Sequence, residues 1–204
     1  GLGKPAGQSI PVTLIQEMFE ALDRVGAFDS LAAVMTGYFT SAAQVITVAK
    51  QISALKAKHE NLHVLVDPVI GDHGKLYVPE SVAEAIRNEL LPLATITTPN
   101  LFELSWLANV NDVNAAVKKL AVAETIVTSL PDDDTHLATE LHYAEGRLRH
   151  LMQRQPNVPN GTGDFLSGCY LGERLNHKAA AAFTNTMTRV ENAVRMSLNA
   201  PSLK

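Results

Sequence analysis

His63-Val-Leu-Val-Asp-Pro-Val-Ile-Gly-Asp72 is the stretch from which the fold of this chain can be read. After His63 comes a short run of aliphatic, mostly β-branched residues with no polar residue between them. Such a run is typical of a strand that is buried on both faces of a parallel sheet. Asp67-Pro68 closes the run, since proline has no N–H to donate to a sheet ladder. We therefore predict a buried strand at residues 63–66.

The period of the apolar residues switches between helix and strand on both sides of this stretch. Helical spacing is found at residues 14–25, 42–52, 82–90, 101–107 and 113–120, and further strand-like runs at 31–35, 94–98 and 125–128. Strands that alternate with helices predict a mostly parallel sheet with helices on both faces. The expected fold class is therefore α/β.

The pattern changes after Ser129. Residues 135–141 and 147–152 alternate with a period closer to two, which predicts a hairpin around Glu145-Gly146. A loop at 153–163 follows, and then two helices at 164–175 and 178–197. We find no repeat or linker, and expect one domain over residues 1–204. The hairpin is a candidate lid over a bound nucleotide.

The composition excludes several classes of function. The chain has 46% hydrophobic and 19% charged residues, which favours a packed core over disorder. The formal net charge of −4, without a long basic run, argues against a nucleic-acid partner. No apolar run approaches the roughly 18 residues of a membrane span. The single cysteine, Cys169, allows no internal disulfide and is consistent with a reducing cytosol.

Small, polar or acidic residues follow each predicted strand. Because ligands bind at the carboxyl ends of the strands in open parallel sheets, we expect these groups to converge on one edge. The groups are Thr36-Gly37-Tyr38, Asp67-Pro68, Thr98-Pro99-Asn100, Thr128-Ser129 and, after the hairpin, Gly161-Thr162-Gly163-Asp164.

The glycine loop before the first closing helix is the sharpest motif. The amides of Gly161, Thr162 and Gly163 would point from a helix N-terminus, where anions bind favourably. Asp164, in the first helical turn, could then accept the proton of an attacking hydroxyl during phosphoryl transfer. The alternative is that Asp164 is only an N-cap behind a glycine turn. There is no Walker A motif to compete with this loop for phosphate.

Two further motifs carry oxygen ligands. Asp67, followed by a glycine-rich turn, could approach a metal–phosphate group, or the stretch could be a plain β-turn with solvated acids. Asn100 and Glu103 are three residues apart and can face the same site, although they could equally form a capping box. Hard oxygen donors suit Mg²⁺, which makes Asp67, Thr98 and Glu103 a plausible ligand set.

These motifs, in this order, resemble those of the ribokinase-like superfamily, and most closely those of the pyridoxal kinases. The resemblance covers nearly the whole chain, although the Asp-Pro-Val and Thr-Pro-Asn motifs are shared with hydroxymethylpyrimidine kinases. The resembling stretches are Val34-Met-Thr-Gly-Tyr38, Val66-Asp-Pro-Val-Ile-Gly-Asp72 with Tyr77, Thr97-Thr-Pro-Asn-Leu-Phe-Glu-Leu104 and Gly161-Thr-Gly-Asp164.

The resemblance implies a three-layer α/β/α sandwich and a cytosolic homodimer that phosphorylates the 5′-hydroxymethyl group of a vitamin B6 vitamer with ATP and Mg²⁺. A need for a monovalent cation is left open. The implied roles are Asp164 as base, Gly161, Thr162 and Gly163 as anion hole, Asp67, Thr98 and Glu103 around metal and phosphate, Tyr77, Asn100, Thr128 and Ser129 along the nucleotide, and Tyr38 near the pyridine ring.

One departure and two rival functions accompany this resemblance. The family's first strand, which ends in a serine at the pyridine ring, has no counterpart before Gly1. Either the sequence omits residues or the chain is a fragment, and part of the substrate pocket is then expected outside it. The rivals are another ribokinase-like small-molecule kinase with the same chemistry, for instance one acting on hydroxymethylpyrimidine, and an inactive vitamer-binding homologue that kept the fold. A doubly wound domain with an unrelated ligand would explain the periodicity but not the three motifs together.

Overall fold

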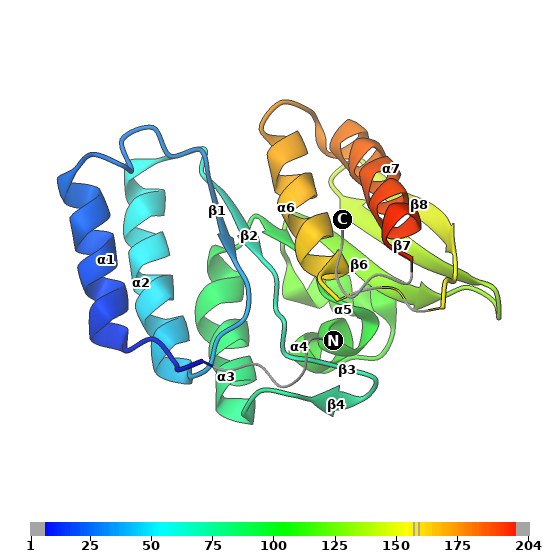
Figure 1. Ribbon diagram of the computed structural model, residues 1–204, viewed down its shortest axis with the longest axis horizontal. Coiled ribbons are helices and arrows are strands. Elements are labelled where there is room, and N and C mark those ends of the chain that lie inside the picture. Colours follow the sequence, from blue (N-terminus) through cyan, green and yellow to red (C-terminus); the bar gives the residue numbers. More distant parts are fainter. Residues whose placement is uncertain (1–6, 157, 159, 199–204) are drawn as a thin grey trace.

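The computed structural model describes residues 7–156, 158 and 160–198, and is built around a six-stranded sheet of order β1-β2-β5-β6-β7-β8 (Figure 1). The strands β1, β2, β5 and β6 pair in parallel, whereas β7 pairs antiparallel with both β6 and β8. The strands are β1 (Ala33–Thr36), β2 (His63–Val66), β5 (Ile96–Thr97), β6 (Glu124–Pro131), β7 (His136–Tyr143) and β8 (Gly146–Gln153). The predicted mostly parallel sheet is thereby confirmed.

Helices cover both faces of this sheet, so the three-layer arrangement is also confirmed. One face carries α2 (Ala42–Lys58), α3 (Glu80–Ala85), α4 (Leu101–Ala108) and α5 (Val113–Leu120), with α1 (Val12–Arg24) packed against α2. The other face carries α6 (Thr162–Arg174) and α7 (Ala179–Ser197). Among the described helices, none combines the length and hydropathy that crossing a membrane requires.

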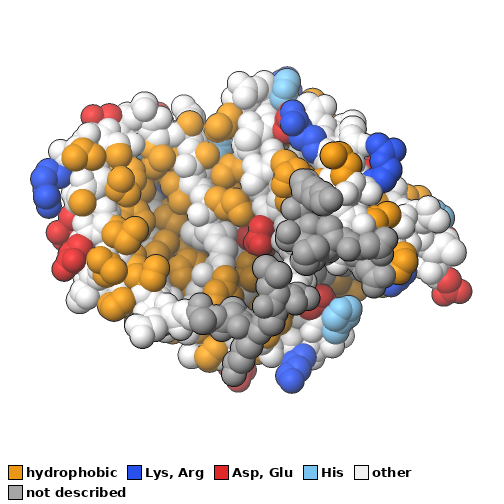
Figure 2. Space-filling model, in the orientation of Figure 1, with side chains coloured by type: hydrophobic (Ala, Val, Ile, Leu, Met, Phe, Trp, Pro, Cys, Tyr) orange, Lys and Arg blue, Asp and Glu red, His pale blue; other side chains and the backbone are white. Residues whose placement is uncertain are grey.

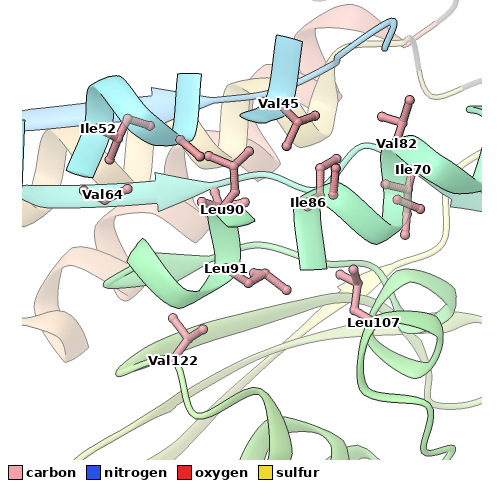
Figure 3. Close-up of a cluster of buried hydrophobic side chains, with 14 of the residues drawn as sticks. Val45, Ile52, Val64, Ile70, Val82, Ile86, Leu90, Leu91, Leu107 and Val122 are labelled. Carbon is pink, nitrogen blue, oxygen red and sulfur yellow. The ribbon is translucent and has the colours of Figure 1, made fainter. Parts of the chain in front are cut away.

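Side chains of β2 alternate between the two helical layers. Val64 and Val66 pack into the layer of α2 and α3, whereas Leu65 packs under α6 and α7. Figure 3 shows part of the first cluster, in which Val64 of β2 lies next to Ile52 of α2. Val64, Leu65 and Val66 are completely buried. A strand that is buried on both faces has no solvent-facing side, which explains why its apolar residues do not alternate with polar ones.

Three local features differ from the sequence-based expectation. The helix after Pro79 is an α-helix only to Ala85, and then continues as a π-helical turn (Ile86–Leu90) and a short 3₁₀ turn (Leu91–Leu93). β6 extends to Pro131 because its antiparallel pairing with β7 continues beyond Thr128, across an irregularity between Val127 and Leu130. The glycine-rich turn after β2 contains a small antiparallel hairpin, β3 (Gly71–Asp72) and β4 (Lys75–Leu76).

The apolar stripe of α1 is largely exposed. α1 contains no buried residue, and the side chains of Leu14, Met18 and Leu22 are 44–52% exposed. Figure 2 shows apolar side chains gathered over the side of the molecule where α1, α2 and β1 lie. β1 is the terminal strand of the sheet, so its outer edge forms no sheet pairing among the described residues.

Candidate active site

Asp67, the first residue after β2, is a buried carboxylate at the predicted edge. It is 7% exposed, and its backbone N–H donates to the carbonyl oxygen of Thr36 at the end of β1, over 3.1 Å. Burial raises the pKa of Asp67 to about 6; a hydrogen bond from Ser167 opposes the rise, and the negative charge of Asp164 adds to it. The structure therefore brings Asp67 and Asp164 within electrostatic range of each other.

The glycine loop leads into α6 as the sequence predicts. Gly161 is the N-cap, with a φ of 95° that glycine adopts without strain, and its carbonyl oxygen accepts from the N–H of Phe165 over 2.9 Å. Asp164 lies in the first turn of α6 and is exposed. The first turn of a helix presents N–H groups that have no intrahelical acceptor, so the loop can hold an anion beside this carboxylate.

A cavity of about 280 Å³ adjoins the loop. Thr162 and Gly163 line it from α6, and Thr128 and Ser129 line it from β6. One wall is apolar, formed by Leu137, Met152, Val158, Leu166, Val190 and Val194. The other lining residues are polar: Thr139, Gln153, Arg154 and Gln155. A polar mouth and an apolar wall suit a ligand that carries phosphate at one end and a planar base at the other.

Asn100 and Glu103 form the capping box that the sequence left open. The side chain of Asn100 accepts from the N–H of Glu103 over 2.9 Å, and the carboxylate of Glu103 accepts from the N–H of Asn100 over 3.0 Å. The other oxygen of Glu103 accepts from the N–H groups of Ile70 and Gly71, at 2.8 and 3.4 Å. Burial raises the pKa of Glu103 to about 7, against the effect of these backbone donors.

The same two residues fasten the β3–β4 hairpin to the start of α4. The amide of Asn100 donates to the carbonyl oxygen of Gly71 over 2.8 Å, in addition to the two bonds that Glu103 accepts from the hairpin side. Gly71 is packed so closely that an added Cβ would lie 2.4 Å from the ring of Phe102. Tyr77 follows the hairpin and is 56% exposed.

The structure brings most of the predicted site residues to one edge of the sheet. Asp67 and Thr98 follow directly after β2 and β5, and Asp164 lies at the start of α6. Thr128 lies within β6, where Asn100 forms a β-bridge with it. Tyr38 follows β1 at the same edge and is 60% exposed. Sequence reasoning missed Ser167, although its position three residues after Asp164 places both on one face of a helix.

The donor set of this edge is compatible with Mg²⁺. Asp67 supplies a buried carboxylate and Thr98 a buried hydroxyl, whereas both carboxylate oxygens of Glu103 already accept backbone N–H groups. The described residues contain no group of three His, Cys, Asp or Glu side chains that could hold a metal ion. A metal here would therefore need phosphate and water as further ligands, which is how Mg²⁺ commonly binds.

Comparisons with known proteins agree with this geometry. The profile of the family described as phosphomethylpyrimidine kinase matches residues 6–202. The pyridoxal kinase PdxY of Granulibacter bethesdensis is 30% identical over 226 residues, which cover 97% of this chain and 78% of that protein. A pyridoxine/pyridoxal/pyridoxamine kinase of Bordetella avium is 34% identical over 189 residues, covering 86% of this chain and 62% of that protein.

The fold of this chain is also similar to that of solved pyridoxal kinase structures. The pyridoxal kinase of Leishmania donovani, in complex with ADP and pyridoxamine, superimposes with a TM-score of 0.86 at 25% identity. The match covers 98% of this chain and 74% of that one. The chain spans about three fifths of the length of the first curated relatives that it matches.

Proposed function

The chain belongs to the phosphomethylpyrimidine kinase family, and within it to the pyridoxal kinases of the ribokinase-like superfamily; from this we propose that it transfers the γ-phosphoryl group of ATP to the 5′-hydroxymethyl group of pyridoxal. One observation carries the proposal. Asp164 is exposed in the first turn of α6, behind the glycine loop and beside a cavity with a polar mouth and an apolar wall.

In the proposed reaction, Asp164 accepts the proton of the hydroxymethyl group as its oxygen attacks the γ-phosphorus. The new O–P bond forms while the bond from the γ-phosphorus to the bridging oxygen breaks, and ADP leaves. The N–H groups of Gly161, Thr162 and Gly163 hold the negative charge that spreads over the transferring oxygens. The exposure of Asp164 fits this role, because the base must reach a bound substrate.

We assign the nucleotide to the cavity lined by Thr128 and Ser129, and assign Tyr77 and Asn100, which do not line this cavity, to a part of the nucleotide that extends beyond it. Asp67 and Thr98 would hold Mg²⁺, which neutralises phosphate charge when bound. Both oxygens of Glu103 accept backbone N–H groups, so we assign this residue an indirect effect on the metal, through the position of the β3–β4 hairpin. Pyridoxamine and pyridoxine, the ligands of related Leishmania kinase structures, make other vitamers candidate substrates.

Tyr38 is our candidate for contact with the pyridine ring. Its side chain is 60% exposed at the same edge of the sheet as Asp67, so a planar apolar surface is free to meet a substrate. The second candidate function is phosphorylation of a hydroxymethylpyrimidine, favoured by the description of the matching family profile. Competition between pyridoxal and hydroxymethylpyrimidine at limiting enzyme separates the two functions.

We also propose that the chain acts as one kinase domain, in the cytosol and as a homodimer. The continuous sheet from β1 to β8 supports the single domain, and the free thiol of Cys169 is consistent with a reducing compartment. The apolar surface over α1 supports pairing. Light scattering coupled to gel filtration tests the pairing, and Met18→Lys is expected to shift the protein toward monomer without loss of folding.

The deciding experiment is ATP-dependent formation of pyridoxal 5′-phosphate, followed by its absorbance, for the parent protein and for Asp164→Asn. Loss of a general base lowers kcat about 10²–10⁴-fold, and we expect a loss in this range. Asp29→Asn, which changes an exposed carboxylate in the loop after α1, serves as the matched control and is expected to act like the parent. A folded, ATP-binding parent that forms no product would refute the pyridoxal assignment.

A further inference from the structure

Ser167 joins three elements of the proposed site. It lies on α6, is 1% exposed, and its hydroxyl oxygen is 2.9 Å from Oδ2 of Asp67 and 2.9 Å from Oγ1 of Thr98. Asp67 follows β2 and Thr98 follows β5, so one hydroxyl contacts the ends of two neighbouring strands. The three side chains are all buried.

The hydroxyl proton of Ser167 has two possible acceptors, Asp67 and Thr98. A serine hydroxyl carries one proton, and an ionised carboxylate only accepts. The hydroxyl of Ser167 lies in donor geometry to both Asp67 and Thr98, and its single proton favours the ionised carboxylate of Asp67, which is the stronger acceptor. Ser167 thereby holds Oδ2 of Asp67, and the side chain of Thr98 also hydrogen-bonds this carboxylate.

Ser167 also relates Asp67 to the proposed base. Asp164 and Ser167 are three residues apart on α6, so they share one face of the helix. The charge of Asp164 acts on Asp67, and two neighbouring carboxylates repel each other. The hydrogen bond from Ser167 holds the Asp67 carboxylate at the ends of the strands, and so keeps it away from the Asp164 carboxylate.

We propose that Ser167 is a positioning residue, which orients the oxygens of Asp67 and Thr98 toward the metal–phosphate group and keeps Asp67 apart from Asp164. This inference rests on the proposed kinase function for the identity of the bound group. Ser167 does not touch substrate in this role. It acts through Asp67 and Thr98, in the way that outer hydrogen bonds orient the ligands of a metal.

The test compares Ser167→Ala and Ser167→Thr with the parent, using Mn²⁺ in the presence of ADP as the probe. Electron paramagnetic resonance measures Mn²⁺ binding directly, without any turnover. Loss of an outer partner of a metal site weakens binding or activity about 10–100-fold, and we expect this for Ser167→Ala in both Mn²⁺ affinity and kcat. The KM for the vitamer is expected to stay within about twofold, because the substrate pocket is unchanged.

Two further variants separate positioning from packing. Ser167→Thr keeps the hydroxyl and is expected to recover most of the Mn²⁺ affinity. Thr186→Val, on α7, changes another buried hydroxyl, one that has no hydrogen-bond partner among the described residues, and is expected to match the parent. The melting temperature of each variant shows whether it folds. If Ser167→Ala does not fold, Ser167→Cys, which keeps the volume and weakens the donor, replaces it with the same expected result.

Parental Mn²⁺ affinity and kcat in folded Ser167→Ala would overturn the proposal. So would equal defects in Ser167→Ala and Ser167→Thr at equal melting temperature, since the hydroxyl would then not matter. If the parent phosphorylates no vitamer, the proposed function fails, and the Mn²⁺–ADP comparison still decides the role of Ser167.

Discussion

Glu103 accepts a hydrogen bond over 2.8 Å from the backbone N–H of Ile70, which precedes it by 33 residues. The bond connects the first turn of α4 to the segment that leads from Asp67 into the β3–β4 hairpin. Glu103 also accepts from the N–H of Gly71, and the side-chain amide of Asn100 donates to the carbonyl oxygen of Gly71. Together these bonds fix the hairpin to the start of α4. The position of Tyr77 relative to the cavity lined by Thr128 and Ser129 therefore depends on Glu103, a carboxylate that the sequence alone could not distinguish from a metal ligand.

Replacement of Glu103 by glutamine is expected to destabilise the protein by about 1–3 kcal/mol, because one buried N–H group then faces an amide donor instead of a carboxylate oxygen. Urea unfolding measures this change. Glu84→Gln, on the exposed side of α3, is the control and is expected to alter the free energy of unfolding by less than about 0.5 kcal/mol. Equal effects of the two substitutions would show that Glu103 does not hold the hairpin.

Stability is expected to fall as the pH rises from about 5 to 7. Burial raises the pKa of Glu103 from 4.5 to about 7 and that of Asp67 from 3.8 to about 6. In this interval the folded state binds more protons than the unfolded state, so the free energy of unfolding decreases with pH and levels off above 7. Urea titrations at pH 5.5 and 7.5 measure the difference, and Glu103→Gln is expected to reduce it. An unchanged difference in that variant would contradict the assignment to Glu103.

Two glycine-to-alanine substitutions are expected to have opposite effects. At Gly71 an added Cβ would lie 2.4 Å from the Phe102 ring and 2.5 Å from the carbonyl oxygen of Lys75, so the hairpin must shift, at a cost of about 1–3 kcal/mol. At Gly168, an exposed position inside α6, the added Cβ meets nothing within 4 Å and alanine favours the helix by about 0.5–1 kcal/mol. Thermal unfolding of both variants tests the prediction, which fails if both move in the same direction.

Arg174 is expected to matter for stability and not for catalysis. Its guanidinium holds Glu124 with N–O distances of 2.9–3.1 Å at the start of β6, opposite the edge that carries the site, and Tyr170 donates to the same carboxylate. Arg174→Met is expected to cost about 2–3 kcal/mol, because a largely buried carboxylate loses its cation. The kcat is expected to stay within about twofold.

Arg189→Met is the matched control for this substitution. Arg189 pairs with Glu173 over 3.0 Å, but its side chain is 62% exposed, and exposed pairs contribute about 0–1 kcal/mol. A large loss of activity in folded Arg174→Met, without a similar effect in Arg189→Met, would show that the two ends of the sheet are coupled.

Local patterns were sufficient to predict the main layers. The β2 strand occupies residues 63–66 as expected, since an apolar run bounded by proline has few alternatives. The β7–β8 hairpin and both closing helices were also predicted, and so was the placement of Asp164 in the first turn of α6. Each of these features depends on residues that are close together in the sequence.

Features that depend on distant partners were not predictable in the same way. The two-residue strands β3 and β4 carry little signal of their own, and they are held by Asn100 and Glu103 from the next unit of the fold. The π-helical turn at Ile86–Leu90 has the same apolar spacing as an ordinary helix. The specific role of each predicted site residue is still a prediction.

The hydrogen bond between Ser167 and Asp67 spans 100 residues of sequence. A contact of this separation closes a long loop, so we expect it to form late, once the units between β2 and α6 have reduced the entropy cost of closure. Recovery of Mn²⁺–ADP binding after dilution from urea is therefore expected to lag behind recovery of helical circular dichroism. A functional assay on this chain would then record the end of folding, whereas a spectroscopic one would record its beginning.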